Sequence, residues 1–232
     1  MFVTAIVVAA GEGVRLGGST PKGYLSIGGR PLIVRTVEKF FLARTITNIV
    51  LVVAQKELHR ASELLGANSR LMGKGCSFQS GGATRQASVV RGLAKLDPEC
   101  DLVAIHDGAR PFVDPRRIDQ CVEAARERGA AVLGVPVRDT IKIVRKERRV
   151  EATPPRGSLW EIQTPQVFRR EWIVQAHDRA LRDNFEATDD ATLVERMDKP
   201  VYVLEGDRTN IKITTPEDLV LAEALLRENR VG

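Results

Sequence analysis

Residues 4–22 read TAIVVAAGEGVRLGGSTPK, and this stretch decides how the rest of the chain can fold. Its first seven residues form a continuous apolar run rich in β-branched side chains, which predicts a strand buried on both faces. The loop that starts at Gly11 contains four glycines, Arg15 and Lys22. Glycines let backbone N–H groups approach an anion closely, and the two cations add positive charge. Strand and loop together therefore predict a binding site for a triphosphate.

The loop does not match two common phosphate-binding loops. A dinucleotide-binding loop needs a third glycine where this chain has Leu16, and an acid after the second strand, where it has Gln55. A P-loop needs Ser or Thr directly after its Gly-Lys pair, whereas Lys22 stands between Pro21 and Gly23. Taken alone, the glycine loop is equally compatible with an ordinary surface connection between a strand and a helix.

Composition narrows the class of protein. A length of 232 residues with 43% hydrophobic residues predicts one α/β domain spanning residues 1–232. The net charge of +5 favours anionic ligands, while 5% aromatic residues without a basic–aromatic pattern predict no nucleic acid. The three cysteines show no Cys-x-x-Cys spacing, so we expect reduced thiols in the cytoplasm and no disulfide or zinc framework. No apolar run reaches membrane-spanning length, and the chain begins directly with a predicted strand, so we expect neither a membrane segment nor a signal peptide.

Strands and helices alternate along the chain. After the first strand, the pattern predicts strands over residues 49–53, 76–79, 102–105, 130–135, 159–168 and 201–204. It predicts helices over residues 31–41, 56–65, about 88–96, after 114, 170–181, 190–197 and from 215 onward. Asp114, the Thr188-Asp189-Asp190 run and Thr215 are the expected helix N-caps. This alternation predicts a doubly wound α/β domain with a mostly parallel sheet.

One segment departs from that alternation. Residues 137–145 alternate polar and apolar side chains, residues 146–148 can turn the chain, and residues 149–151 can return it. This predicts a two-stranded arm over about residues 138–157. An isolated hairpin is marginal in water, so we expect the arm to dock on a second subunit, although a solvated cationic ribbon is the alternative.

Candidate binding residues follow the predicted strands. Residues 80–89 form a second glycine stretch after the third strand, and Asp107 and Arg110 follow the fourth. Ligands bind at this edge of an open parallel sheet, so Asp107 is well placed to hold a metal or to orient a phosphate. It could instead cap the next helix, but Asp114, directly before a proline, fits that role better. His106 is interpreted as a packed structural histidine.

Taken together, these residues resemble the 2-C-methyl-D-erythritol 4-phosphate cytidylyltransferase family over nearly the whole chain. The resemblance is carried by the following motifs: residues 9–22, Gly81-Gly82 with Arg85 and Ser88, His106-Asp107-x-Ala109-Arg110-Pro111, Pro136-Val137-Arg138-Asp139-Thr140-x-Lys142, Thr164-Pro165-Gln166, Thr188-Asp189-Asp190-Ala191 and Asn210-Ile211-Lys212. The resemblance implies a cytidylyltransferase of non-mevalonate isoprenoid synthesis that joins CTP to a polyol phosphate and releases pyrophosphate.

The resemblance also implies roles for individual residues. The implied catalytic residues are Arg15, Lys22 and Lys212. The implied CTP-binding residues are Ala9, Ala10, Gly11, Gly13, Gly81, Gly82, Arg85, Ser88 and Asp107. The implied acceptor-binding residues are Arg110, Thr140, Arg156 and Thr164, of which Thr140 and Arg156 reach the site from an arm that crosses a homodimer interface. Mg²⁺ is expected on the CTP phosphates, with Asp107 as an outer partner and no metal site in the protein itself.

The implied reaction needs no nucleophilic or basic side chain. A phosphate oxygen of the acceptor is already an anion at neutral pH, and it attacks the α-phosphorus of CTP. Charge neutralisation and in-line positioning are what remain for the protein to supply. One position departs from the pattern, because some relatives carry an acid where this chain has Ala83, and Ala83 is therefore left out of the expected site.

Two alternatives stay open at this stage. Ribitol-5-phosphate cytidylyltransferase performs the same reaction on another polyol phosphate, which phosphate-binding residues do not distinguish. The motifs at residues 136–142 and 210–212 resemble the methylerythritol phosphate family more closely. A non-catalytic nucleotide-sensing domain is the second alternative, and the joint presence of Arg15, Lys22, Asp107 and Lys212 argues against it. We expect no fused downstream synthase, because the sequence ends at Gly232.

Overall fold

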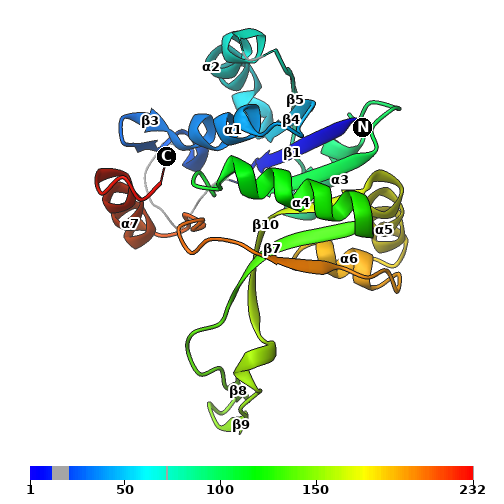
Figure 1. Ribbon diagram of the computed structural model, residues 1–232, viewed down its shortest axis with the longest axis vertical. Coiled ribbons are helices and arrows are strands. Elements are labelled where there is room, and N and C mark those ends of the chain that lie inside the picture. The colour runs from blue at the N-terminus through cyan, green and yellow to red at the C-terminus, as the bar shows by residue number, and fades with distance from the viewer. Residues whose placement is uncertain (12–20, 72, 232) are drawn as a thin grey trace.

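The computed structural model describes residues 1–11, 21–71 and 73–231. A seven-stranded sheet in the order β11-β7-β10-β6-β1-β4-β5 forms its centre (Figure 1). The bounds are β1 (Val3–Ala9), β4 (Asn48–Val53), β5 (Gly75–Ser80), β6 (Leu102–Asp107), β7 (Ala130–Pro136), β10 (Trp160–Arg169) and β11 (Tyr202–Glu205). Neighbouring strands are parallel except around β10, which runs antiparallel to β6 and β7.

The first strand is buried on both faces, as its apolar run predicts. Val3, Ala5 and Val7 of β1 pack on one face of the sheet, and Ile6 packs on the other. Successive side chains of a strand point to opposite faces, so a strand between two helical layers must be apolar throughout.

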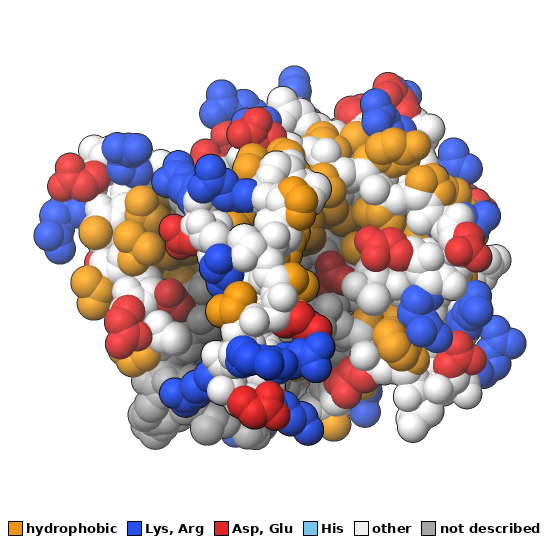
Figure 2. All heavy atoms as spheres, turned by 90° about the horizontal axis from the view of Figure 1, so that it is seen from below, with side chains coloured by type: hydrophobic (Ala, Val, Ile, Leu, Met, Phe, Trp, Pro, Cys, Tyr) orange, Lys and Arg blue, Asp and Glu red, His pale blue; other side chains and the backbone are white. Residues whose placement is uncertain are grey.

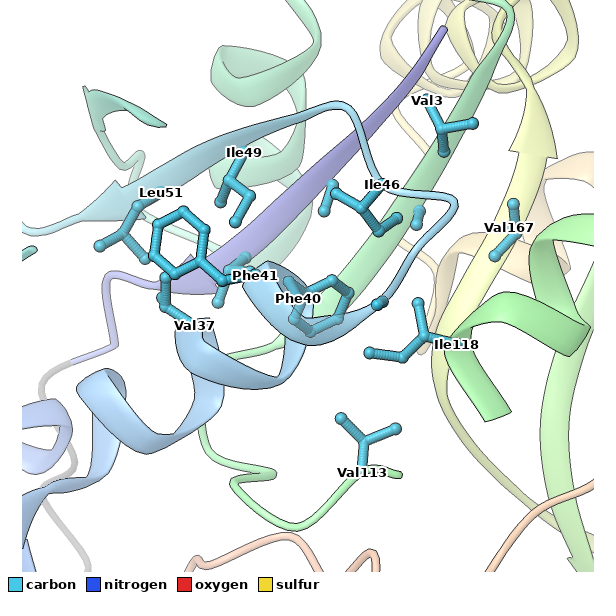
Figure 3. Packing of buried hydrophobic residues seen from close by; sticks show 14 of the residues in the cluster. Val3, Val37, Phe40, Phe41, Ile46, Ile49, Leu51, Val113, Ile118 and Val167 are labelled. Carbon is cyan, nitrogen blue, oxygen red and sulfur yellow. The ribbon is translucent and has the colours of Figure 1, made fainter. Parts of the chain in front are cut away.

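Helices cover both faces of the sheet. One face carries α1 (Leu32–Leu42), α2 (Leu58–Leu71) and α4 (Pro115–Arg128), and the other carries α3 (Arg85–Leu93), α5 (Arg170–Arg182) and α6 (Asp190–Glu195). Figure 3 shows Phe40 and Phe41 of α1 close to Ile49 and Leu51 of β4 and to Ile118 of α4, in one core. The predicted doubly wound, mostly parallel sheet is confirmed. In the described part of the chain, no helix is both long and apolar enough to cross a membrane.

The predicted helix caps are present. The Asp114 carboxylate accepts the Arg116 backbone N–H at the start of α4, and Asp189 accepts that of Thr192 at the start of α6. Thr215 opens α7 (Pro216–Arg227) with a reciprocal capping box. Each cap pairs backbone donors that have no partner inside the helix.

A small hairpin next to α7 was not predicted. It consists of β2 (Ser26–Ile27) and β3 (Arg30–Pro31), which pair antiparallel. Two-residue strands give no usable periodicity, but the Gly28-Gly29 pair between them is a turn signal that the sequence does contain. Both glycines have positive φ, +54° and +75°, as the tight turn between such strands requires.

The arm is shorter in regular structure than the sequence predicts. The expected strand over residues 137–145 is wrong for most of its length, because only β8 (Ile143–Val144) pairs with β9 (Val150–Ala152). Figure 1 shows these strands projecting well away from the sheet. Residues 138–153 are exposed in the single chain, so no packed surface supports a longer ladder there.

Gly129 follows α4 and packs closely against Trp172 of α5, so a substitution there measures how tightly these elements are packed. Its φ is +94°, and an added Cβ would lie 2.2 Å from Cη2 of Trp172. We expect Gly129→Ala to lower the free energy of unfolding by about 2–4 kcal/mol, through backbone strain and overpacking. The measurement is urea denaturation at neutral pH.

Gly29→Ala is the matched control. Gly29 also has a positive φ, +75°, but no atom lies within 4 Å of an added Cβ. Its expected cost is the strain alone, about 1–2 kcal/mol. Equal losses for the two variants would contradict the packing part of the argument.

Candidate functional site

A cleft of about 620 Å³ opens where β1, β4 and β6 end. In the sheet, β1 lies between β4 and β6, and the strand order reverses at β1 because the chain adds β4 on one side of it and β6 on the other. The cleft lies at this point, where ligands bind in sheets of this kind. Its lining residues are Val8, Ala9, Ala10, Gly11, Lys22, Gly23, Leu32, Ala54, Gln55, Gly81, Gly82, Ala83, Thr84, Arg85, Ser88, Asp107, Gly108, Ala109 and Lys212.

Most sequence-predicted CTP-binding residues meet in this cleft. They are Ala9, Ala10, Gly11, Gly81, Gly82, Arg85, Ser88 and Asp107, and Lys22 and Lys212 join them. Arg15 and Gly13 lie outside the described residues. The charged side chains that line the cleft are Lys22, Arg85, Lys212 and Asp107, so the described part of its wall has an excess of positive charge that suits an anion.

Glycines bring the backbone of the cleft wall close together. A Cβ on Gly81 would lie 2.2 Å from Cβ of Ala10, and one on Gly108 would lie 2.7 Å from Cβ of Ala9. The Ser88 hydroxyl donates to the Thr84 carbonyl at 2.9 Å and accepts the backbone N–H of Gly82 at 3.1 Å. The glycines therefore permit a close backbone approach, and Ser88 fixes the shape of the second glycine loop.

Arg91 makes a contact with the second glycine loop that was not predicted from the sequence. Its guanidinium donates to the carbonyl oxygen of Gly81 at 2.7 Å. One lone pair of that oxygen is thus already used, while the other remains available to a ligand in the cleft.

The electrostatic centre of the cleft is Asp107, the last residue of β6. One carboxylate oxygen accepts Nε of Arg85 at 2.9 Å, and the other lies 2.7 Å from Nζ of Lys212. Burial alone would raise the pKa of Asp107, but these two cations outweigh it and hold the pKa well below its usual range. Asp107 is therefore an anion that fixes two cations at the mouth of the cleft.

Lys212 reaches the cleft from the loop between β11 and α7. Two residues earlier, the Asn210 amide donates to the carbonyl of Thr164 at 3.0 Å and to Oε1 of Gln163 at 3.1 Å. One residue later, the Ile213 N–H donates to the carbonyl of Ala109 at 2.9 Å. Both sides of Lys212 are thus tied to β10 and to the loop after β6.

Thr164 lies behind Asp107 rather than on the cleft wall. Its hydroxyl accepts the backbone N–H of Asp107 at 3.1 Å and lies 3.0 Å from Nδ1 of His106. His106 Nε2 is 3.0 Å from the Arg110 carbonyl, which only accepts, so Nε2 carries the proton and Nδ1 accepts from Thr164. The interpretation of His106 as a structural residue agrees with these contacts.

The four expected acceptor-binding residues do not meet in one chain. Arg110 donates to the carbonyl of Asn210 at 2.7 Å and, like Thr164, is absent from the cleft lining. Thr140 and Arg156 lie exposed on the arm, where Arg156 donates to the carbonyl of Arg138 at 2.8 Å. The single chain therefore supplies a nucleotide-sized cleft and leaves the arm residues away from it.

Several lining residues were not predicted from the sequence. Ala54 and Gln55 directly follow β4, and Gly108 and Ala109 directly follow β6. Their position in the sequence could have identified them, because each follows a strand at the edge of the sheet where ligands bind. Thr84 was missed because it caps α3 with its hydroxyl and gives no separate chemical signature.

The described residues contain no cluster of three His, Cys, Asp or Glu side chains that could hold a metal ion. Asp107 is the carboxylate that lines the described part of the cleft, and both of its oxygens already contact cations. It retains further lone pairs and can contribute one oxygen to a hard cation such as Mg²⁺. A bound Mg²⁺ would need other ligands, such as the phosphates of a nucleotide.

His106 should make the stability of the protein depend on pH. Burial lowers its pKa from 6.5 to about 4, so the folded protein prefers the neutral ring. The stability that the neutral His106 ring contributes is complete above the unfolded pKa, and about 3 kcal/mol of it is lost as the pH falls from about 6.5 to 4. Urea unfolding between pH 7 and pH 4 should show a steeper loss of unfolding free energy for the wild type than for His106→Gln.

His59→Gln, at an exposed position, controls for the loss of one histidine. Parallel profiles of unfolding free energy against pH for the wild type and His106→Gln would contradict the expectation.

Proteins of one family resemble this chain over almost its whole length. Residues 3–228 match the family model of 2-C-methyl-D-erythritol 4-phosphate cytidylyltransferase. The protein of that name from Geobacillus kaustophilus is 49% identical over 97% of both chains. The one from Caldanaerobacter subterraneus is 45% identical over 98% of this chain and all of the relative.

Solved structures agree with the sequence relatives. A 4-diphosphocytidyl-2C-methyl-D-erythritol synthase from Anaerococcus prevotii superposes with a TM-score of 0.88 at 33% identity, covering 97% of this chain and 96% of the other. The 2-C-methyl-D-erythritol 4-phosphate cytidylyltransferase of Thermus thermophilus gives a TM-score of 0.78 at 38% identity, covering 98% and 100%. The chain with the cleft centred on Asp107 thus belongs to the 2-C-methyl-D-erythritol 4-phosphate cytidylyltransferase family.

Proposed function

We propose that this protein transfers the cytidylyl group of CTP to 2-C-methyl-D-erythritol 4-phosphate. The products are 4-diphosphocytidyl-2-C-methyl-D-erythritol and pyrophosphate, in isoprenoid precursor synthesis by the non-mevalonate pathway. The observation that carries the proposal is the cationic cleft in a chain of this family, where Arg85 and Lys212 contact Asp107 and Lys22 lines the same wall. Residues 1–232 act as a single nucleotidyltransferase domain, and the absence of disulfides among its three cysteines fits action in the cytoplasm.

The chemistry requires charge stabilisation rather than proton transfer. The acceptor phosphate attacks the α-phosphorus of CTP in line with the departing pyrophosphate, and negative charge spreads over the phosphate oxygens. The ammonium groups of Lys22 and Lys212 are the described cations best placed to hold that charge, and Arg15 completes the set. Fixed cations of this kind stabilise the transition state without reorganising during the reaction.

The remaining roles follow from the cleft wall. The backbone of Ala9, Ala10 and Gly11 approaches the phosphates and the base, and the loop at Gly81 and Gly82 holds the base and ribose. Gly13, outside the described residues, is assigned to the same CTP site. Asp107 would contribute an oxygen to a Mg²⁺ carried by the CTP phosphates, and that cation would neutralise part of their charge. Asp107 also keeps Lys212 in place.

The acceptor is bound by two subunits. Arg110 and Thr164, which are absent from the cleft lining of the single chain, are assigned to the chain that binds CTP, and Thr140 and Arg156 come from the arm of a second copy. The exposed arm carries apolar side chains that support docking: Ile141, Ile143, Val144 and Val150 are 41–52% exposed in the single chain. Figure 2, seen from below, shows Lys and Arg side chains on this face together with Asp, Glu and hydrophobic side chains.

Ribitol 5-phosphate is the competing acceptor. Both acceptors are polyol phosphates, so a phosphate-binding cation does not distinguish them, and the full-length family match favours methylerythritol phosphate. A nucleotide-sensing domain without catalysis is the less favoured alternative.

Pyrophosphate release with each nucleotide and acceptor pair tests the proposal. We expect turnover with CTP and methylerythritol phosphate and little with ribitol 5-phosphate. UTP should be poor, because a carbonyl replaces the exocyclic amine of cytosine and leaves buried backbone acceptors unpaired, at about 1–3 kcal/mol for each group. Equal use of CTP and UTP, or preference for ribitol 5-phosphate, would contradict the assignment, and no pyrophosphate with any pair would favour the sensing domain.

Subunit exchange tests the shared site. Lys22→Ala should lower turnover by about 100- to 1,000-fold, since it removes a cation aimed at the transition state. Arg156→Ala should abolish acceptor binding from the arm. After mixing the two inactive homodimers, about half of the dimers are mixed, and each mixed dimer has one intact site if the arm serves the partner, so activity should return to about a quarter of wild type. If Arg156 serves its own chain, every site keeps one defect and mixing restores nothing.

A further inference from the structure

A row of alternating charges leads from the cleft into the protein interior. Lys212 contacts one oxygen of Asp107 at 2.7 Å, and Arg85 Nε contacts the other at 2.9 Å. Arg85 Nη1 lies 2.8 Å from one oxygen of Asp190, whose second oxygen is 3.1 Å from Nε2 of His177. The row ends there, in the layer formed by α5 and α6.

Asp190 is the innermost carboxylate of this row. Its side chain is 1% exposed, and that of His177 is 2% exposed. Burial would raise the pKa of Asp190, but Arg85 and the hydrogen bond from His177 outweigh burial and lower it. A buried anion of this kind persists only with charged or hydrogen-bonding partners, and Asp190 has both. Asp190 is absent from the cleft lining, so its partner is Arg85 rather than the substrate.

The backbone under Asp190 is itself held in place. Gln166 of β10 accepts the N–H groups of Asp190 and Ala191 at 3.1 and 3.0 Å. Its amide donates to Asp189 at 2.8 Å. The start of α6 is therefore tied to the central sheet, and Asp190 is a fixed point against which Arg85 is held.

Two carboxylates on different nitrogens determine how Arg85 is placed. With Asp107 alone, the guanidinium would be held by a single hydrogen bond, whereas the ion pair of Nη1 with Asp190 holds it from a second side. The position of Arg85 in turn constrains the carboxylate of Asp107, and that carboxylate holds Lys212.

We propose that Asp190, supported by His177, is a positioning residue for the transfer reaction. It fixes Arg85, so that Asp107 and the ammonium of Lys212 stay where the reacting phosphates bind. This inference rests on the proposed function. Loss of Asp190 should slow the chemical step rather than weaken CTP binding. A displaced Lys212 would make weaker contacts with the charge that develops in the transition state.

Asp190→Asn is the direct test, since it keeps the size of the side chain and removes its charge. We expect kcat to fall by about 10- to 100-fold, the effect of a small displacement of a reacting group, while the KM for CTP stays within about threefold. The assay measures pyrophosphate release at saturating CTP and acceptor. Wild-type enzyme without turnover would defeat the proposed function, whereas normal wild-type turnover with an unchanged kcat for Asp190→Asn would overturn only the positioning role.

Two variants of His177 test the same link with Asp190 in place. His177→Leu removes the donor to Asp190, and its kcat should fall severalfold. His177→Gln retains an N–H donor and should restore most of that loss. Equal kcat values for the two variants would overturn the supporting role of His177.

Gln86→Ala is the matched control for a merely structural effect. Gln86 lies on α3 next to Arg85 and holds the chain before α6, through the Phe185 carbonyl and the Ala187 N–H, both at 3.0 Å. It does not contact the charged row. We expect its melting temperature to fall while its kcat stays within about threefold of wild type. A loss of kcat equal to that of Asp190→Asn would show that loosening this region is sufficient, and the proposal would be withdrawn.

Discussion

The ion pairs of Asp107 with Arg85 and Lys212 are the interaction on which the cleft depends. Asp107 ends β6, Arg85 begins α3, and Lys212 lies in the loop before α7, so three separate segments meet at one carboxylate. Without that anion, two cations would face each other in a partly buried site and repel. With it, they form a rigid positive wall beside the carboxyl end of the central strand, ready for a phosphate chain.

A second constraint is the closeness of the backbone around that wall. Gly81 and Gly108 stand where a Cβ would collide with Ala10 and Ala9, so the strand ends and the glycine loop meet almost without side chains between them. Backbone N–H and carbonyl groups can then face a nucleotide directly. Glycines and alanines give the cleft its shape, and a few long charged side chains at its rim give it its charge.

The arm follows a different physical rule. It leaves the sheet after β7 and returns into β10, and its strands have no layer behind them in the single chain (Figure 1). The regular part is therefore short, and apolar side chains stay exposed on it. A surface of this kind gains stability only by covering another surface, which links the fold of the arm to the proposed shared site.

The sequence by itself determined the order of the elements, the burial of β1 and the N-caps at Asp114 and Thr215, because apolar periodicity and capping are local. It also placed the glycine loops and Asp107 at strand ends, and the motifs there identified the family. Only the tertiary structure decided that Asp107 is shared by Arg85 and Lys212, that Thr164 lies behind it, and that Asp190 holds Arg85 from the interior. Those contacts join residues 20 to more than 100 positions apart, and no local pattern encodes which charges will meet once the sheet brings them together.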